Sequence, residues 1–416
     1  MRSRFRSILA VIVLFQAATT LHAREGDEFR TAVLTSAEQS IDRQTWSRSG
    51  DGWSVSKRTL HGGKQEGVEV ITIDNGVLQI DVVPTRGMSI QEIRRGKMRL
   101  GWDSPVKELV HPAFIDLESR GGLGWLDGFG EWMVRCGLEF AGHPGTDTII
   151  NNTGDSADID LTLHGKIGNI PASEVEVRVD KQPPHRIEVR GVVYERSFKG
   201  PNLRLVAAVS TVPGESAFRI DDEVANLGAG DQEFQIIYHM NFGAPLLEQG
   251  AKVHVAPRKI SPMNEHAAEN IGSFATYPSP TDGYIEEVYL VEPYADEQGI
   301  SSAVLQDAAG NNAASIRWST KQLPYLTVWK NTASQAEGYV TGIEPGTGFP
   351  FNRRIERAAG RVPKLKPGES RRFTLDIGLS SGRSAVQDAI RAVEKIRADR
   401  PIEIQRTPPA TDPDRH

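Results

Sequence analysis

Three titratable residues share a local context that would present each of them to a ligand. Glu344 ends the β-rich run YVTGIE and is followed by Pro-Gly-Thr-Gly, His164 ends an apolar run before a glycine, and His239 ends the β-rich run EFQIIYH. A sheet can hold such side chains rigidly while the loop leaves room for a substrate. Singly, each fits a structural role, as a surface Glu before a turn or a satisfied histidine. Together, a carboxylate and an imidazole facing one pocket are the minimum set for general base and general acid catalysis.

The elements that must position these residues are short β-strands. Two runs flank Asp74-Asn75-Gly76, and Asn-Gly accepts the positive φ values of a tight hairpin. The spacing of the runs is that of a sandwich, and the helices between them are too short for parallel crossovers. The predicted fold class is therefore all-β. The β-rich runs are 68–73, 77–83, 187–195, 203–212, 217–225, 233–239, 284–291, 302–307, 325–330, 338–344 and 371–379.

Two helices are predicted outside the strands. Residues 35–46 offer a cap at Thr35, and the 384–398 segment places four apolar residues on one helical face. Those four residues are Val386, Ile390, Val393 and Ile396. Between the strands, residues 101–145 are rich in Trp, Gly and charge and lack period-2 alternation, which predicts a long structured loop with a functional role. We expect one domain over 24–398 and a mobile tail over 399–416.

The first 23 residues have the pattern of a secretory signal peptide. Residues 1–7 carry three arginines, 8–18 are almost entirely apolar, and Ala23 offers a cleavage position. We therefore expect an exported protein, periplasmic or secreted, with no integral membrane segment after cleavage. Leu21 stands where signal peptidases prefer a smaller residue, which leaves a retained N-terminal anchor as the alternative.

Composition gives no reason to expect a nucleic-acid partner and rules out an internal disulfide. The 416-residue chain has a net charge of -6, so it gives no electrostatic reason to expect nucleic acid as a partner. Cys136 is the sole cysteine and cannot form an internal disulfide. A buried, small apolar role for Cys136 is favoured over a nucleophilic one.

Several short motifs, taken in order, resemble the galactose mutarotase-like, or aldose 1-epimerase, superfamily. They are LHG at 163–165, YHMNFG at 238–243 and GIEPGT at 342–347. A closer likeness is to an uncharacterised bacterial branch, the domain of unknown function 4432 family. It is carried by VPTRGMSI at 83–90, LGWDSPV at 100–106, GLGWLDGF at 122–129 and RCGLEFAGHP at 135–144. The resemblance covers residues 65–380.

The resemblance implies a large antiparallel β-supersandwich with a carbohydrate site on one sheet. By the motif match, Glu344 is the general base, His239 is the general acid and His164 hydrogen-bonds the sugar. The expected partner is thus a small-molecule carbohydrate. Interconverting anomers requires only proton transfers, with Glu344 ionised and His239 charged at rest, so no metal or nucleotide cofactor is implied. The sequence accordingly lacks CxxC, P-loop and GxGxxG patterns.

Further residues are candidates for contact with the sugar. Arg86 and Arg135 are the cations most expected there, with His143 as a competing candidate. Trp125, Asp127 and Trp329 offer apolar faces and hydrogen bonds to a pyranose. Glu287 would reach the site only if it lies on the inward face of its strand. For each of these residues the alternative is a structural role, in core packing, in a turn or on the solvated surface. Arg353 and Arg354, after the Glu344 loop, either bind an acidic group or form a solvated pair.

Three functions follow from these predictions. The first is an exported isomerase that acts on a free or modified sugar. The second is a carbohydrate-binding protein of the same fold without turnover. The third is a metal enzyme that uses His164, His239 and Glu344 as ligands, which ranks lowest because the HExxH spacing of hydrolytic zinc sites is absent.

Overall fold

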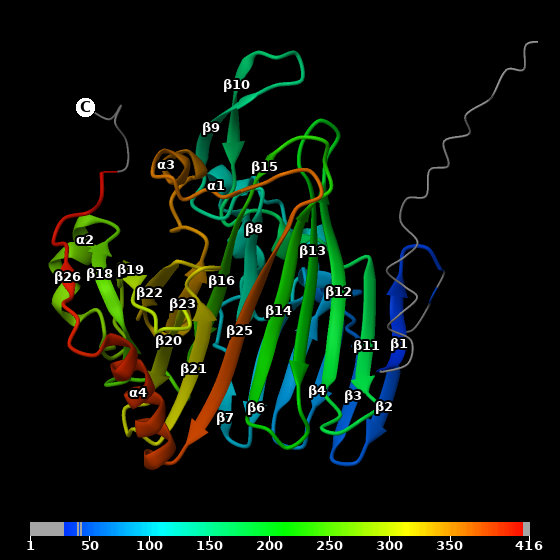
Figure 1. Cartoon of the computed structure of the whole chain (residues 1–416), viewed down its shortest axis with the longest axis horizontal. Coiled ribbons are helices and arrows are strands. Elements are labelled where there is room, and N and C mark those ends of the chain that lie inside the picture. The colour runs from blue at the N-terminus through cyan, green and yellow to red at the C-terminus, as the bar shows by residue number, and fades with distance from the viewer. Residues whose placement is uncertain (1–28, 40, 42–43, 411–416) are drawn as a thin grey trace, which may run out of the picture.

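The computed structural model describes residues 29–39, 41 and 44–410, and these form two large, mostly antiparallel sheets that face each other (Figure 1). The predicted all-β class is confirmed. The predicted signal peptide, 1–23, lies outside the described residues. Within the described part of the chain, no helix is long and apolar enough to cross a membrane.

The nine-stranded sheet is built mainly from consecutive strands of the middle of the chain. In spatial order it contains β1 (Phe29–Ser36), β11 (Glu174–Asp180), β12 (Ile187–Arg196), β13 (Asn202–Thr211), β14 (Ala217–Asn226), β25 (Ser370–Ser381), β21 (Asn312–Ser319), β20 (Ile300–Gln306) and β17 (Lys252–Val255).

The thirteen-stranded sheet joins both ends of the chain. Its order is β2 (Trp46–Gly50), β3 (Trp53–Thr59), β4 (Glu69–Asp74), β5 (Gln79–Val83), β6 (Ser89–Arg95), β8 (Met133–Leu138), β16 (Gln235–Phe242), β23 (Val340–Gly346), β22 (Tyr325–Asn331), β19 (Glu287–Pro293), β18 (Pro257–Pro262) and β26 (Glu403–Ile404), with β7 (Met98–Leu100) paired to β6. Among the strands of the described residues, β26 alone pairs in parallel, with β18.

Smaller elements lie at the edges and ends of the sheets. Two-stranded sheets are formed by β9 (Gly145–Ile150) with β10 (Ser156–Leu161), and by β15 (Gln232–Glu233) with β24 (Lys364–Leu365). The α-helices are α1 (Ser119–Gly122), α2 (Glu265–Glu269), α3 (Arg353–Ala358) and α4 (Arg383–Arg397). Short 3-10 helices are η1 (Gly63–Gln65), η2 (Pro84–Arg86), η3 (Pro112–Phe114), η4 (Gly124–Gly128), η5 (Ile167–Asn169), η6 (Ile271–Ser273) and η7 (Gln335–Glu337).

The main hydrophobic core fills the space between the two sheets. It includes Val189 and Leu205 of the nine-stranded sheet and Ile80, Met240 and Ile343 of the other. Because successive side chains of a strand point to opposite faces, the alternate residues of β16 and β23 point away from this core. We call that side of the thirteen-stranded sheet its outer face. Every residue of β16 and β23 is buried, so the outer face is covered as well.

Most predicted elements are confirmed. The Asp74-Asn75-Gly76 turn joins β4 and β5 as an antiparallel hairpin. The helix α4 buries the four predicted apolar residues against the nine-stranded sheet (Figure 1).

Three predictions differ from the structure. The helix at 35–46 is wrong: Thr35 lies in β1 and pairs with Val175 of β11, and residues 37–39, 44 and 45 form bends before β2. The segment 101–145 is structured, as predicted, but it contains the central strand β8, whose six residues are all buried and so show no alternation. The predicted mobile tail is attached to the thirteen-stranded sheet through β26.

Candidate active site

His239 and Glu344 lie side by side on the outer face of the thirteen-stranded sheet. Met240 of antiparallel strand β16 is opposite Ile343 of β23. His239, one residue before Met240, is therefore opposite Glu344, one residue after Ile343, and both side chains point to the outer face. The His239 Nε2 atom is 3.3 Å from Glu344 Oε1. Glu344 is also opposite Thr327 of β22, which fixes its backbone from the other side. Two adjacent interior strands of the sheet, β16 and β23, therefore bring the predicted acid and base together.

The Glu344 carboxyl is buried without an ion-pair partner of fixed charge. Glu344 is 2% exposed, and its Oε1 atom has no hydrogen-bond partner among the described residues, although His239 Nε2 lies 3.3 Å away. Burial raises the pKa of Glu344 well above its usual value, and the nearby charge of Glu286 raises it further. Gly342 makes room for this carboxyl, since a Cβ there would lie 2.2 Å from Oε1.

The His239 imidazole is held among aromatic rings. The ring centroids of Phe129, Trp329 and Trp125 lie 5.3, 5.6 and 5.8 Å from that of His239. Its Nδ1 atom is 2.7 Å from Asn241 Oδ1. Burial lowers the pKa of His239 to about 4, although the hydrogen bond to Asn241 opposes this.

His164 reaches the same site from the turn that follows β10. It has a positive φ of 58° in a tight turn before Gly165, where any side chain would collide with backbone oxygens of Phe140 and Gly137. Its Nδ1 atom is 3.0 Å from the carbonyl oxygen of Ala141, and its ring lies 5.1 Å from that of His239. Burial lowers the pKa of His164 well below its usual value, and His239 lowers it further.

The aromatic residues predicted from the sequence divide between interior and edge. Trp125 is 1% exposed and packs against His164 at 4.6 Å, while its indole Nε1 has no acceptor among the described residues. Trp329 is half-buried and donates from Nε1 to Glu286 Oε2 at 2.6 Å. Phe129, which the sequence reasoning missed, lies between the two. Trp125 thus forms the inner wall of the site and Trp329 its solvent side.

The acid beside Trp329 is Glu286, not the predicted Glu287. Glu287 points to the opposite face, where it contacts Lys330, Tyr289 and Asn270. Glu286 is exposed and lies close enough to Glu344 to raise its pKa. The two residues are neighbours, and the period of two in the strand decides which one reaches the site.

The two predicted arginines are not brought to the site. Arg135 is fully buried on the inner face, where its guanidinium binds Asp222 of β14 at 2.5 and 2.9 Å. Arg86 is fully buried in η2 and donates to Glu131 at 2.8 Å and to the carbonyl oxygen of Gly128 at 3.0 Å. Both charges are already neutralised inside the protein, so neither is available to a sugar.

The remaining polar candidates lie at the rim or beyond it. His143 is exposed and is within electrostatic range of Glu286 and His164. Asp127 forms a partly exposed ion pair with Arg120 at 2.6 Å. Cys136 is buried as predicted, and burial raises the pKa of its thiol, with Glu344 and Glu131 contributing.

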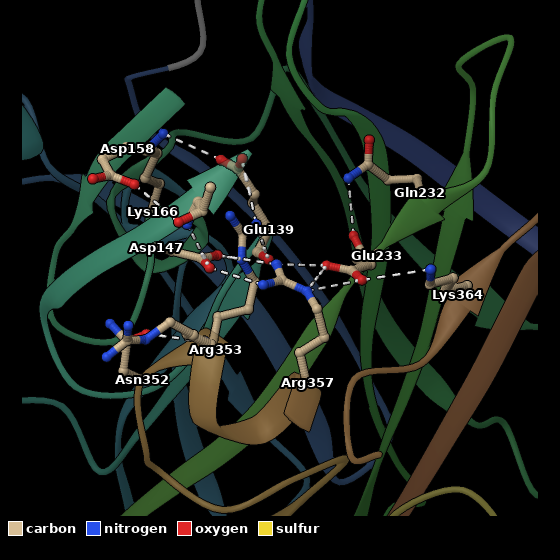
Figure 2. Close-up of polar contacts among 12 residues, drawn as sticks. Glu139, Asp147, Asp158, Lys166, Gln232, Glu233, Asn352, Arg353, Arg357 and Lys364 are labelled. Atoms are coloured by element: carbon tan, nitrogen blue, oxygen red, sulfur yellow. Dashed lines mark hydrogen bonds and ion pairs between the residues drawn. The ribbon is translucent and has the colours of Figure 1, made fainter. Parts of the chain in front are cut away.

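Arg353 is used structurally. Figure 2 shows Arg353 and Arg357 converging on Asp147, at 2.6 Å and 2.8 Å, with Glu233 on the far side of Arg357. Burial alone would raise the pKa of Asp147, but hydrogen bonds from Arg357 and Arg353 outweigh it and lower that pKa. This cluster fastens α3 to β9 and leaves Arg353 3% exposed. An acidic ligand therefore cannot take its charge without breaking a buried ion pair.

Chemically, the site offers one carboxyl and two imidazoles with shifted proton affinities. Burial favours the neutral form of Glu344 and of His239, rather than the charged pair that the resemblance implies at rest. The neutral pair and the charged pair contain the same number of protons. A single proton transfer converts one into the other, so the site can supply a base and an acid together. Among the described residues, no group of three or more His, Cys, Asp or Glu side chains is arranged to hold a metal ion.

Comparisons with known proteins agree with this fold. A candidate aldose 1-epimerase from Klebsiella pneumoniae is 42% identical over 92% of this chain and 100% of its own, with a TM-score of 0.87. A galactose mutarotase-like protein from Clostridium acetobutylicum (15% identity, 82% and 100% covered, TM-score 0.53) and a galactose 1-epimerase from Lactobacillus acidophilus (14%, 79% and 99%, 0.50) share the fold.

No functionally curated protein matches the chain. Residues 65–379 match the family described as "Domain of unknown function (DUF4432)". This match includes Glu344, His239 and His164. The chain therefore belongs to the DUF4432 family and has the fold of galactose mutarotase-like proteins.

Proposed function

We propose that this protein interconverts the anomers of a free or modified aldose by general acid–base opening and closure of the sugar ring. The observation that carries the proposal is the contact of 3.3 Å between Glu344 and His239, two buried titratable groups without a fixed counter-charge. Buried carboxyls are normally paired, and an unpaired one beside an imidazole is typical of a catalytic site. The Klebsiella relative, whose name indicates the same activity, supports the proposal.

The reaction needs two coupled proton transfers. Glu344 takes the proton of the C1 hydroxyl while His239 gives a proton to the ring oxygen. The C1–O bond of the ring breaks and a C1 carbonyl forms. Rotation about C1–C2 then allows closure on either face, and the two residues exchange roles. To begin, Glu344 passes its proton to His239, which sugar hydroxyls favour by hydrogen-bonding the carboxylate.

The neighbouring groups suit a neutral sugar. His164 has its Nδ1 proton committed to Ala141, so the Nε2 atom of the neutral ring is free to accept a hydroxyl proton. Trp329 offers an aromatic face and Glu286 a carboxylate on the solvent side. Arg86, Arg135 and Arg353 are each bound to acids elsewhere, so these three do not favour a phosphorylated or acidic sugar.

The test is exchange spectroscopy by NMR, with polarimetry, on a panel of neutral reducing sugars. Wild type should accelerate anomer exchange, and Glu344→Gln should reduce the rate by about 10²–10⁴-fold, the usual contribution of a positioned acid or base. Glu195→Gln is the matched control, because Glu195 is also buried, with a pKa raised to about 7 by burial, but binds the backbone of Leu138 away from the site. It should leave the rate unchanged.

Two other outcomes would contradict the proposal, the first by rejecting catalysis and the second by rejecting Glu344 as the specific base. Exchange at the uncatalysed rate for every reducing sugar would remove the mutarotase proposal. If calorimetry then showed that one of the sugars binds, the protein would be a carbohydrate-binding member of the same fold. Equal losses in Glu344→Gln and Glu195→Gln would indicate a general effect of buried charge rather than a specific base.

A further inference from the structure

Asn241 holds the imidazole of His239 from the side away from Glu344. It lies two residues after His239 on β16, so both side chains point to the outer face. Asn241 is fully buried, and its Oδ1 atom is 2.7 Å from His239 Nδ1. The opposite ring nitrogen, Nε2, is the one that lies 3.3 Å from Glu344.

The direction of the Asn241 amide is determined by its other contacts. Its Nδ2 atom is 3.0 Å from the carbonyl oxygen of Glu131 and 3.3 Å from that of His239. Carbonyl oxygens only accept hydrogen bonds, so the amide must present its NH₂ group to them. Its oxygen therefore faces the imidazole, and Nδ1 of His239 must carry a proton to donate to it.

The support behind Asn241 is rigid. The same Glu131 carbonyl also accepts from the indole of Trp102 at 3.3 Å, and the Glu131 side chain is bound by Arg86. The backbone nitrogen of Asn241 donates to the carbonyl oxygen of Trp132 at 2.6 Å. Arg86, predicted from the sequence to contact the sugar, thus stabilises the residue that orients Asn241.

We propose that Asn241 is a positioning residue that keeps the Nδ1 proton of His239 in place, so that Nε2 alone exchanges protons in the site. The other titratable groups facing His239 are Glu344 from β23 and His164 from the turn after β10. The remaining neighbours are rings, which neither donate to nor accept from Nδ1. The consequence for turnover rests on the proposed function, whereas the position of the proton does not.

The ¹⁵N chemical shifts of the His239 ring measure the position of the proton directly. In wild type at neutral pH, Nδ1 should be protonated. In Asn241→Leu, which has a similar volume but no acceptor, the Nε2-protonated form should become populated. A wild-type ring protonated only at Nε2 would overturn the proposal, as would an unchanged Nδ1 signal in Asn241→Leu.

Kinetics test the consequence for turnover. Asn241→Leu should lower kcat by about 10–100-fold, the usual effect of removing a hydrogen bond that orients a functional histidine, as measured for metal-bound histidines. KM should be nearly unchanged, because Asn241 does not contact the sugar. Asn241→Asp keeps an acceptor and should restore most of kcat. Its carboxylate should also raise the pKa of His239 and move the acid limb of the pH–rate profile to higher pH.

A matched control separates positioning from stability. Asn226 is also fully buried and donates to two carbonyl oxygens, but it lies on β14 and has no histidine partner. Asn226→Leu should lose stability without a change in the His239 spectrum or in kcat. If Asn241→Leu fails to fold, the wild-type and Asn241→Asp spectra still decide where the proton lies. If wild type turns over no sugar, those spectra remain informative and only the proposed function fails.

Discussion

The two faces of the thirteen-stranded sheet differ in whether a buried ionisable group has a permanent counter-charge. On the inner face, Arg135 is bound by Asp222, and Tyr238 donates to the same carboxylate at 2.9 Å. On the outer face, Glu344 is equally buried, but its neighbour is the imidazole of His239, which has no charge when it is deprotonated. Adjacent residues of one strand, Tyr238 and His239, belong to these two environments.

The difference separates stability from chemistry. A buried charge that is fully paired keeps one protonation state, which suits a structural bond. A buried acid whose charge is not compensated has a raised pKa and can give up or take a proton near neutral pH. The inner pair therefore holds the two sheets together, and the outer pair is able to react.

The largest expected effect comes from breaking the inner pair. Asp222→Asn leaves the fully buried guanidinium of Arg135 without its counter-charge. We expect the free energy of unfolding to fall by about 3–5 kcal/mol, the usual cost of removing one partner of a buried pair. Urea unfolding followed by intrinsic fluorescence measures it.

Asp221 is the matched control, since it is the neighbour of Asp222 on β14. It is half-buried and accepts one hydrogen bond from Thr374 at 2.8 Å. Asp221→Asn should cost about 1 kcal/mol or less. Similar losses at the two positions would show that the inner pair has no special role.

The strands could be predicted from the sequence better than the faces of the strands. A hairpin such as β4–β5 is encoded locally by Asn75-Gly76 and by alternation on either side. In the segment YIEEVYL, however, both Val288 and Tyr289 are apolar, because this strand is buried on both faces. Periodicity then cannot tell which acid, Glu286 or Glu287, points to the site.

The structural role of Arg135 could not be predicted from the sequence either. Nothing beside Arg135 in the sequence indicates that its partner is Asp222, on a strand of the other sheet. The catalytic candidates could be found because each ends an apolar or β-rich run and lies in a motif that resembles the superfamily. The sequence did not show that β16 and β23 continue past His239 and Glu344, to Phe242 and Gly346. Asn241 and Gly342 could not be found, because their roles depend on what lies across the sheet.

The outer pair can be disturbed without loss of the fold by a side chain at Gly342. A Cβ at this position would lie 2.2 Å from Glu344 Oε1, so the flexible carboxyl must move while the strand remains. Gly342→Ala should lower kcat by about 10–100-fold, since displacement of a catalytic group by about 1 Å has effects of that size. Stability should change by less than about 1 kcal/mol.

Gly378→Ala provides the comparison for that variant. Gly378 lies in β25 and its Cβ would meet only the hydroxyl of Ser315, at 2.8 Å. Activity should be unchanged. If Gly342→Ala retained full kcat, the position of the Glu344 carboxyl would not matter for the reaction.

The pH dependence of stability should have opposite signs in paired and unpaired acids. The pKa of Glu344 is raised from 4.5, so the unfolded chain ionises first and wild type loses stability as pH rises above about 4.5. Glu344→Gln lacks this loss, and its advantage over wild type should grow by up to about 1.4 kcal/mol per pH unit until the folded pKa is passed.

Asp147 supplies the opposite case. Its pKa is lowered from 3.8 by Arg357 and Arg353 despite burial, so its contribution is present above that value and is lost as pH falls through the folded pKa. Asp147→Asn should therefore be less stable than wild type at neutral pH, with a difference that shrinks in acid. Unfolding free energies measured from about pH 2 to pH 8 test both signs, because the Asp147 contribution is lost below 3.8 and the Glu344 contribution changes above 4.5. Parallel curves for the two variants would contradict the contrast.

The smallest expected effect is at the solvent side of the outer face. Trp329→Phe keeps a ring beside His239 but removes the indole donor that binds Glu286 at 2.6 Å. The released carboxylate should hold the sugar less well, and KM should rise about fivefold, corresponding to about 1 kcal/mol, with kcat nearly unchanged. Trp318 of the nine-stranded sheet is the matched control, because its indole donates at 3.0 Å to the carbonyl oxygen of Leu323. Trp318→Phe should reduce stability and leave KM unchanged, whereas a loss of kcat in Trp329→Phe would place its indole in the chemistry and not only in binding.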